Sequence, residues 1–222
     1  MAKRTRFLLV GLGLLLLILI GFSVRQTAPD TPNIEKAGDN LMIVAHPDDE
    51  SIFAGNELLH EDYVVICLTN GTNQTRRREF QRAMQKTGDV GIILNYPDKT
   101  NGERDNWDGV RDAIREELAE DLSAKEWKKI VTHNPDGEYG HIHHKMTNQI
   151  VTALCEEQGL DERLVYFGKY FKKSKRKEQP APILSDSELT RKQELLECYA
   201  SQSKVIDGLS HILAYEQLQA AK

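Results

Sequence analysis

The chain of 222 residues has a formal net charge of −5, which limits the classes of protein to consider. Four basic residues precede the first acidic residue, Asp30, so the part after Arg25 carries −9 (−5 minus +4), and this acidic body argues against a nucleic-acid partner. Three cysteines are too few for a disulfide framework or a cysteine zinc cluster, and we interpret them as small buried residues: Cys67, Cys155 and Cys198.

The first apolar stretch, residues 7–24, contains 18 residues without a charge. At ~1.5 Å per residue, a helix of this length spans roughly 27 Å, enough for the hydrocarbon core of a bilayer. More basic residues precede this stretch than follow it, which predicts an extracytoplasmic body. We therefore expect a transmembrane anchor at residues 1–25, with a cleaved signal peptide as the alternative, a polar linker at residues 26–40 and one domain at residues 41–222.

From residue 41 onward, apolar runs alternate with segments of helical periodicity. The apolar runs predict buried strands at residues 41–44, 63–69, 91–95, 127–132 and 163–167. Amphipathic spacing predicts helices from residue 51, at residues 76–87 and 107–122, from residue 141 towards 157, and at residues 186–205 and 208–220. This alternation indicates an α/β fold, a Rossmann-like parallel sheet with helices on both faces. We interpret the basic run at residues 172–177 as a solvated loop, with an anionic partner as the alternative.

The strand at residues 41–44 leads directly into a charged motif, His-Pro-Asp-Asp-Glu at residues 46–50. Ligands of open α/β sheets bind at the carboxyl ends of strands, so this motif is placed like a binding site. A pair such as His46 and Asp49 suits zinc or a neighbouring divalent metal, which leaves Asp48 as a free carboxylate. In the alternative interpretation, the two aspartates only cap the helix that follows.

A second cluster, His-Ile-His-His at residues 141–144, follows the strand at residues 127–132. His141 and His144 are three residues apart and share a face once helical, whereas His143 is expected to point elsewhere. Both clusters fall at the same edge of the predicted sheet. Three protein ligands with an open position are the arrangement of a catalytic zinc, so we expect a metal site here.

These motifs resemble the LmbE-like/PIG-L superfamily of zinc-dependent de-N-acetylases. Residues 46–50 are similar to the first motif of that family, and His141 with His144 resembles the second. Further matches lie in the helix after the second strand and near the carboxyl terminus: Arg76, Glu79, Ala83, Gly88, Lys192, Tyr199, Ser201 and Gln202. Between the two histidines the family usually has a proline or similar residue and then Asp or Asn, whereas this chain has Ile142 and His143.

The resemblance implies that Zn²⁺ has three ligands: His46, Asp49 and His144. It also implies that Asp48 is the general base. His141 would assist the developing charge, together with Tyr139, which resembles a tyrosine found two residues before this histidine in some relatives. Arg76 and Asp98 are expected at the same edge of the sheet as candidates for sugar contacts, with a helix-start ion pair and a turn residue as their alternatives.

The activity implied by the resemblance is removal of an N-acetyl group from a glycan or glycolipid that contains N-acetylglucosamine. An extracytoplasmic body would meet such a substrate in the cell envelope. Two alternatives remain open at this point. The first is a membrane-tethered protein that binds a glycan or metal without turnover, and the second is hydrolysis of another amide or an ester. The sequence does not predict the oligomeric state.

Overall fold

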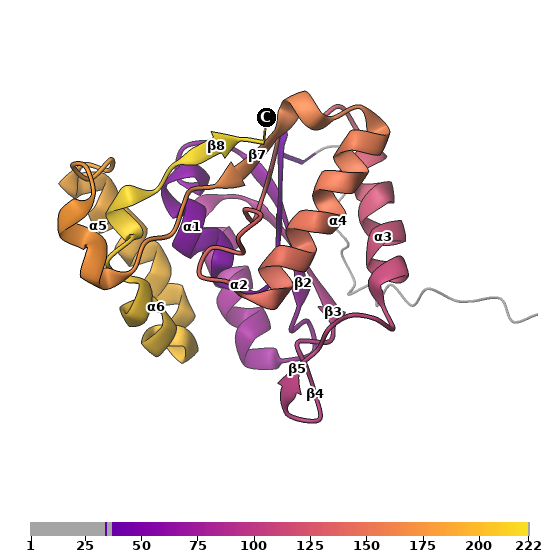
Figure 1. The fold of residues 1–222 in the computed structure, drawn as a ribbon, viewed down its shortest axis with the longest axis horizontal. Coiled ribbons are helices and arrows are strands. Elements are labelled where there is room, and N and C mark those ends of the chain that lie inside the picture. Colours follow the sequence, from indigo (N-terminus) through magenta and orange to yellow (C-terminus); the bar gives the residue numbers. More distant parts are fainter. Residues whose placement is uncertain (1–33, 35–36, 222) are drawn as a thin grey trace, which may run out of the picture. The chain divides into compact units, whose positions relative to one another are not determined.

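The computed structural model describes residue 34 and residues 37–221. A six-stranded sheet forms the centre of this part of the chain, in the order β3-β2-β1-β6-β7-β8 (Figure 1). Its strands are β1 (Asn40–Val44), β2 (Tyr63–Thr69), β3 (Val90–Tyr96), β6 (Lys129–Thr132), β7 (Leu164–Phe167) and β8 (Leu218–Ala220). The first five pair in parallel, and β8 pairs antiparallel with β7. The predicted parallel sheet is thus confirmed for its five main strands.

Helices cover both faces of the sheet because alternate residues of the central strands enter two different cores. On one face, Met42 and Val44 pack in a core that includes residues of α1 (Asp49–Leu58), α2 (Gln74–Thr87) and α5 (Asp186–Leu196). On the other face, Leu41 and Ile43 pack with residues of α3 (Arg111–Ser123) and α4 (Ile142–Gln158). Figure 1 shows α3 and α4 on the side of the sheet opposite to α1, α2 and α5. The predicted α/β architecture is therefore present. The cysteines are buried as expected.

Three local predictions were wrong. The helix expected from residue 107 begins at Arg111, because Trp107 has a positive φ of 58° and lies in the preceding turn. The helix expected at residues 208–220 is absent: α6 (Ser203–Leu209) ends there, and β8 follows after a short 3₁₀ turn. A small hairpin of β4 (Lys99–Thr100) and β5 (Glu103–Arg104) was not anticipated.

The strand order of the sheet reverses between the neighbouring parallel strands β1 and β6. From β1 the next strands, β2 and β3, extend to one side, whereas β6 and β7 extend to the other. Ligands of open α/β sheets bind at such a switch point, beyond the carboxyl ends of the strands. The segments after β1 and β6 carry the two predicted motifs, so the topology brings them together.

Every helix within residues 37–221 is too short or too polar to cross a bilayer. The expected anchor at residues 7–24 lies outside the described residues and stays a prediction. The basic run at residues 172–177 is fully exposed and overlaps a 3₁₀ turn at Lys173–Glu178, in which Lys175 pairs with Glu178 at 2.7 Å.

Candidate metal centre

The turn after β1 holds a residue under backbone strain. Asp48 has a φ of 123°, which a residue with a Cβ rarely adopts, and such strain is concentrated at functional sites. Asp48 precedes α1, but its side chain makes no hydrogen bond to the helix amides. Asp49 instead accepts a hydrogen bond from the backbone amide of His46 at 2.8 Å, outside the helix. The alternative in which these aspartates cap the helix is therefore wrong.

The three predicted metal ligands converge. Asp49 lies between the two imidazoles: one carboxylate oxygen is 3.1 Å from Nδ1 of His46, and the other is 3.2 Å from Nε2 of His144. All three side chains are almost completely buried. Donor atoms around a tetrahedral zinc are ~3.3 Å apart, given Zn–N and Zn–O distances of ~2.0–2.2 Å. Asp49 thus lies at the spacing of a metal ligand from each imidazole. Among the described residues, two groups that share these side chains have the spacing of a metal site: His46 with His141 and His144, and Asp49 with His133 and His144.

One buried nitrogen supports the same fit. Nε2 of His144 has no hydrogen bond of acceptable geometry among the described residues, although Asp49 is close to it. Its other nitrogen, Nδ1, lies 2.5 Å from Oε2 of Glu138, which fixes the direction of the ring. An orphaned buried ring nitrogen is costly unless a ligand completes it. The residues present therefore fit a metal ion whose direct ligands include His144, with Glu138 behind it.

Electrostatics at this site favour a cation. Burial alone would lower the pKa of His144, but the carboxylates of Asp49 and Glu138 raise it to about 10. Burial alone would raise the pKa of Asp49, but His144 and His46 hold it well below its usual range. The site thus keeps a carboxylate in its ionised form beside two imidazoles. A metal ion takes the place of protons at such a site, because metal ligands must be deprotonated.

Asp48 lies beside the cluster without joining it. Its carboxylate is buried and contacts Nη2 of Arg76 at 3.2 Å, and the same guanidinium also binds the carbonyl of Pro47. Burial, and then the charge of Asp49, raise the pKa of Asp48 well above its usual range, while Arg76 opposes the shift. A carboxyl group with a raised pKa is suited to take and return a proton near neutral pH. Arg76 therefore positions Asp48, and its expected contact with a sugar stays a prediction.

His141 and Tyr139 flank the same cluster. His141 is the residue before α4, with an extended backbone, and its Nδ1 accepts a hydrogen bond from the amide of His143 at 3.2 Å. Its ring stacks on His144 with centroids 4.5 Å apart. Burial, and then the neighbouring histidines, lower the pKa of His141 to about 3, so it is neutral with its proton on Nε2. Tyr139 is 43% exposed at the rim, with its ring 5.5 Å from that of His144.

The expectation that His143 points elsewhere was wrong. Its Nδ1 is 3.0 Å from Nε2 of His46, and its ring is buried. Asp98, proposed for a sugar contact, also lies here, with Oδ1 3.4 Å from Nε2 of His46, and it pairs with Arg104. The spacing argument treated residues 141–144 as helical, but α4 begins at Ile142, so His143 lies in its first turn and faces the first motif.

A family model described as GlcNAc-PI de-N-acetylase, PIG-L, matches residues 41–155. This segment is more than half of the chain and contains both motifs. The chain belongs to the PIG-L family. An uncharacterized protein of Acanthamoeba polyphaga mimivirus is 34% identical over 136 residues, which are 54% of this chain and 59% of that protein. The N-acetylglucosaminyl-phosphatidylinositol de-N-acetylase of Bos taurus is 28% identical over 149 residues, 60% of this chain and 57% of that enzyme. The alignments thus cover less than two thirds of these relatives.

Solved structures of deacetylases share the fold. The pseudoaglycone deacetylase Dbv21 superposes with a TM-score of 0.58 at 18% identity, over 79% of this chain and 87% of that one. The N,N'-diacetylchitobiose deacetylase of Pyrococcus horikoshii superposes with a TM-score of 0.59 at 16% identity, over 83% of this chain and 79% of that one. At these identities the likeness establishes the fold of the PIG-L family and nothing further.

Hydrogen bonds tie the first motif to the carboxyl-terminal segment, and that segment to α2. Glu50 is completely buried and accepts hydrogen bonds from the hydroxyls of Tyr199 at 2.5 Å and Ser51 at 2.6 Å. On α2, Glu79 accepts two hydrogen bonds from Ser201, at 2.7 Å from the amide and 2.6 Å from the hydroxyl. Tyr199 and Ser201 thus tie the carboxyl-terminal segment to the first motif and to α2.

Two residues of the site had no predicted role from the sequence: His133 and Glu138. His133 follows β6 directly; its Nε2 accepts from the amide of Ala45 at 3.0 Å, and its Nδ1 contacts Oε2 of Glu138 at 3.0 Å. Glu138 thereby links His133 to His144. A signal for His133 was available in the sequence, because this residue stands directly at the carboxyl end of a predicted strand, where ligands of such sheets bind.

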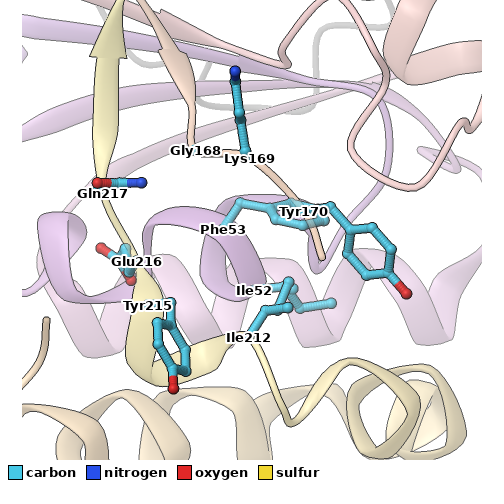
Figure 2. A pocket seen from close by; sticks show the side chains of 9 residues that line it. All are labelled: Ile52, Phe53, Gly168, Lys169, Tyr170, Ile212, Tyr215, Glu216 and Gln217. Atoms are coloured by element: carbon cyan, nitrogen blue, oxygen red, sulfur yellow. The ribbon is translucent and has the colours of Figure 1, made fainter. Parts of the chain in front are cut away.

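Figure 2 shows the side chains that line a small cavity, Phe53 among them. Its volume of about 20 Å³ has room for a water molecule and no sugar. It is lined by residues of α1, of the segment after β7 and of the segment before β8: Ile52, Phe53, Gly168, Lys169, Tyr170, Ile212, Tyr215, Glu216 and Gln217. Phe53 lines this cavity, and its ring centroid lies 6.0 Å from that of His144.

Proposed function

We propose that this member of the PIG-L family is a zinc-dependent hydrolase that removes the N-acetyl group from an N-acetylglucosamine unit of a glycan or glycolipid. The observation that carries the proposal is the pairing of a three-ligand cluster with a buried carboxylate, Asp48, that is not itself a ligand. A binding site needs the ligands, but only a reaction needs the additional base. The substrate class is supported by the family match and by the name of the bovine relative.

Amide hydrolysis requires an activated water, a polarised carbonyl and a proton for the departing amine. Zinc held by His46, Asp49 and His144 would supply Lewis acidity toward the acetyl carbonyl and toward water. Asp48 then takes the proton of the attacking water and returns it to the amine, for which its raised pKa is suited. Arg76 holds Asp48 in place through its 3.2 Å contact, so that the carboxylate does not turn toward the helix amides.

The negative oxygen that develops on the acetyl carbon needs a hydrogen-bond donor. His141 offers Nε2–H, because its Nδ1 is occupied by the amide of His143 and its ring is neutral. A fixed donor close to the ligands stabilises the transition state more than the substrate. Tyr139 is a second donor at the rim, where its hydroxyl keeps its proton, since burial and the acidic residues around it raise its pKa.

The test is acetate release by the purified protein from a panel of N-acetylated sugars and glycolipids, with and without zinc. We expect release from at least one N-acetylglucosamine compound. Release from an ester but from no amide would favour the alternative hydrolase. Binding of the glycans without any release would favour the binding protein, and in that case Asp48→Asn would leave the binding unchanged.

We further propose that residues 7–24 anchor the enzyme with its body outside the cytoplasm, where an envelope glycan would be the substrate. The support is the charge asymmetry of the sequence around this run. Protease added to intact cells should then digest the body and spare only a short amino-terminal stub. A body that is protected until the membrane is opened would reverse the topology and exclude an envelope substrate.

A further inference from the structure

We propose that His143 is a positioning residue that sets the tautomer of the metal ligand His46, through a hydrogen-bond relay that starts at the backbone carbonyl of Asp105. The inference rests on the proposed metal site but needs no substrate. It also gives a role to His143, at which this sequence departs from the family resemblance described above. The relay consists of two contacts that follow one another: Asp105 O to His143 Nε2 at 2.8 Å, and His143 Nδ1 to His46 Nε2 at 3.0 Å.

The first contact fixes the proton of His143. A backbone carbonyl only accepts hydrogen bonds, so at 2.8 Å the Nε2 atom of His143 must carry a hydrogen. A neutral ring has one such hydrogen, and therefore Nδ1 presents a lone pair. The ring is buried and stacks on Trp107 with centroids 4.5 Å apart and planes 4° from parallel, which holds both nitrogens in place.

The second contact passes this choice to the metal ligand. Because Nδ1 of His143 is an acceptor, Nε2 of His46 must donate, and so it carries a hydrogen. Nδ1 of His46 is then left with the lone pair that a metal requires. That atom faces Oδ2 of Asp49 at 3.1 Å, so two electron-rich atoms meet where a cation fits. The opposite tautomer would place a hydrogen there and direct it at Asp49, which would close the site.

Asp98 strengthens the relay as a second acceptor. Its Oδ1 is 3.4 Å from Nε2 of His46 and 3.5 Å from Nδ1 of His143, so it attracts the same hydrogen. These three side chains also have the spacing of a metal site. Two features oppose a second ion: Arg104 already neutralises Asp98, and His46 would have to bind a metal through both nitrogens.

The relay is tested by zinc affinity in two variants of His143. His143→Phe keeps a ring for Trp107 but has no acceptor. His143→Asn places Oδ1 where Nδ1 was, because both atoms are bonded to Cγ. Partners of this kind change metal affinity by ~10–100-fold. We expect zinc to bind His143→Phe about 10–100-fold more weakly than the parent in a chelator competition, and His143→Asn to recover most of that loss. His60→Phe, at an exposed position just after α1, is the control and should match the parent.

A second readout observes the relay directly. In zinc-loaded, ¹⁵N-labelled protein, long-range correlations assign the hydrogen of each imidazole, and we expect it on Nε2 of both His143 and His46. Far-ultraviolet circular dichroism verifies that each variant is folded. A hydrogen on Nδ1 of His143, unchanged affinity in folded His143→Phe, or equal weakening in His143→Phe and His143→Asn would each overturn the proposal. So would two zinc ions per parent chain, of which His143→Phe loses one. Failure to find deacetylation would leave all of these readouts intact.

Discussion

Each half of α1 lies beside a group of buried charged side chains. The two groups differ in how many of their polar atoms have hydrogen-bond partners. The helix is interrupted at Ala54, which has non-helical backbone angles (φ −143°, ψ 27°). Behind the interruption, the amides of Asn56 and Glu57 donate to the two carboxylate oxygens of Glu216 at 3.0 and 2.8 Å. Glu216 in turn binds the ammonium group of Lys192 at 2.6 Å, and Lys192 is completely buried.

At the amino-terminal end of α1, the buried donor atoms of the candidate metal centre are only partly hydrogen-bonded to one another. Nε2 of His144 lacks a hydrogen bond within the described residues, and Nδ1 of His46 faces a carboxylate oxygen. Burial penalises a charge unless partners compensate it. A buried ion pair with all its hydrogen bonds therefore serves stability, whereas buried nitrogen and oxygen atoms that lack partners indicate a binding site. The pair Lys192–Glu216 stabilises the fold, and Gly55 allows Lys192 to approach α1, since a Cβ there would lie 3.1 Å from its side chain. The cluster of buried imidazoles around Asp49 instead offers donor atoms that fit a cation.

The largest expected effect is loss of the metal. Replacing any one of the predicted ligands His46, Asp49 or His144 with alanine should lower zinc content from one per chain to near zero and abolish turnover. His60→Ala removes an exposed histidine just after α1 and outside the cluster, so it is the matched control and should keep one zinc. Metal analysis of the folded variants decides each residue separately. A variant that retains its zinc would remove that residue from the ligand set, and His141, which lies in the same cluster, would be the next candidate.

Removing the proposed base should have the next largest effect. Asp48→Asn keeps the size of the side chain but removes the carboxylate, so turnover should fall by ~10²–10⁴-fold while one zinc stays bound. Steady-state acetate release and metal analysis on the same sample measure both quantities. Arg76→Met is the companion variant: it leaves the carboxylate but removes the guanidinium that holds it, and we expect a smaller loss of turnover. Nearly full activity in Asp48→Asn would exclude the mechanism.

Breaking the buried ion pair of Lys192 and Glu216 should lower stability and leave the zinc content unchanged. Lys192→Met leaves the carboxylate of Glu216 buried with amide partners only, and loss of one member of a buried pair typically costs ~3–5 kcal/mol of stability. Chemical unfolding should show a loss of about 3 kcal/mol or more, whereas zinc per folded chain stays at one. Lys128→Met is the control, because that side chain is 73% exposed in its ion pair with Asp39. Adding Glu216→Gln to Lys192→Met should restore part of the loss. Reduced zinc content in folded Lys192→Met would mean that the two regions are coupled.

Most of this fold could be predicted from the sequence, because its determinants are local. Apolar runs gave the strands of the parallel sheet, and Gly88, which ends α2 in the left-handed conformation, marked a helix boundary. The carboxyl-terminal segment could not be assigned in this way. The apolar spacing of residues 208–220 predicts a helix, but the end of this segment pairs as β8 with β7. The sequence of the segment alone gives no signal of such a nonlocal contact.

The meeting of the two motifs was also predictable, since the carboxyl ends of β1 and β6 must meet at the switch point, whereas the ligand set itself stays a prediction. The supporting contacts were not predictable. The role of His143 depends on where α4 begins and on Trp107, whose positive φ brings its ring under that of His143. The link from His133 through Glu138 to His144 depends on the turn between β6 and α4. These are packing outcomes of several elements, which spacing along one segment does not contain.

The smallest expected effect concerns the carboxylate of Asp89, which has fewer partners than Glu216 and is not part of the candidate metal centre. Asp89, just after α2, accepts a hydrogen bond from the amide of Tyr63 at 2.8 Å but has no cationic partner in an ion pair among the described residues. Burial raises its pKa from 3.8 to about 6, although hydrogen bonds from Thr87 and Tyr63 oppose the shift. The folded state therefore binds this proton more tightly than the unfolded state. The resulting stability is fully present below pH 3.8 and is lost as the pH rises through 6.

Asp89→Asn removes this pH dependence and keeps the acceptor oxygen for Tyr63. Because Asp89 is partly exposed, solvent reduces the effect, and we expect the variant to be ~1 kcal/mol more stable than the parent at pH 7.5. The difference should shrink between pH 6 and pH 4 and vanish below it. Urea unfolding of both proteins across this range measures the difference, from which any loss of zinc at low pH cancels. Asp108→Asn, at an exposed position, should show no such trend. A gain for Asp89→Asn that is the same at every pH would mean that the charge of Asp89 is not its cause.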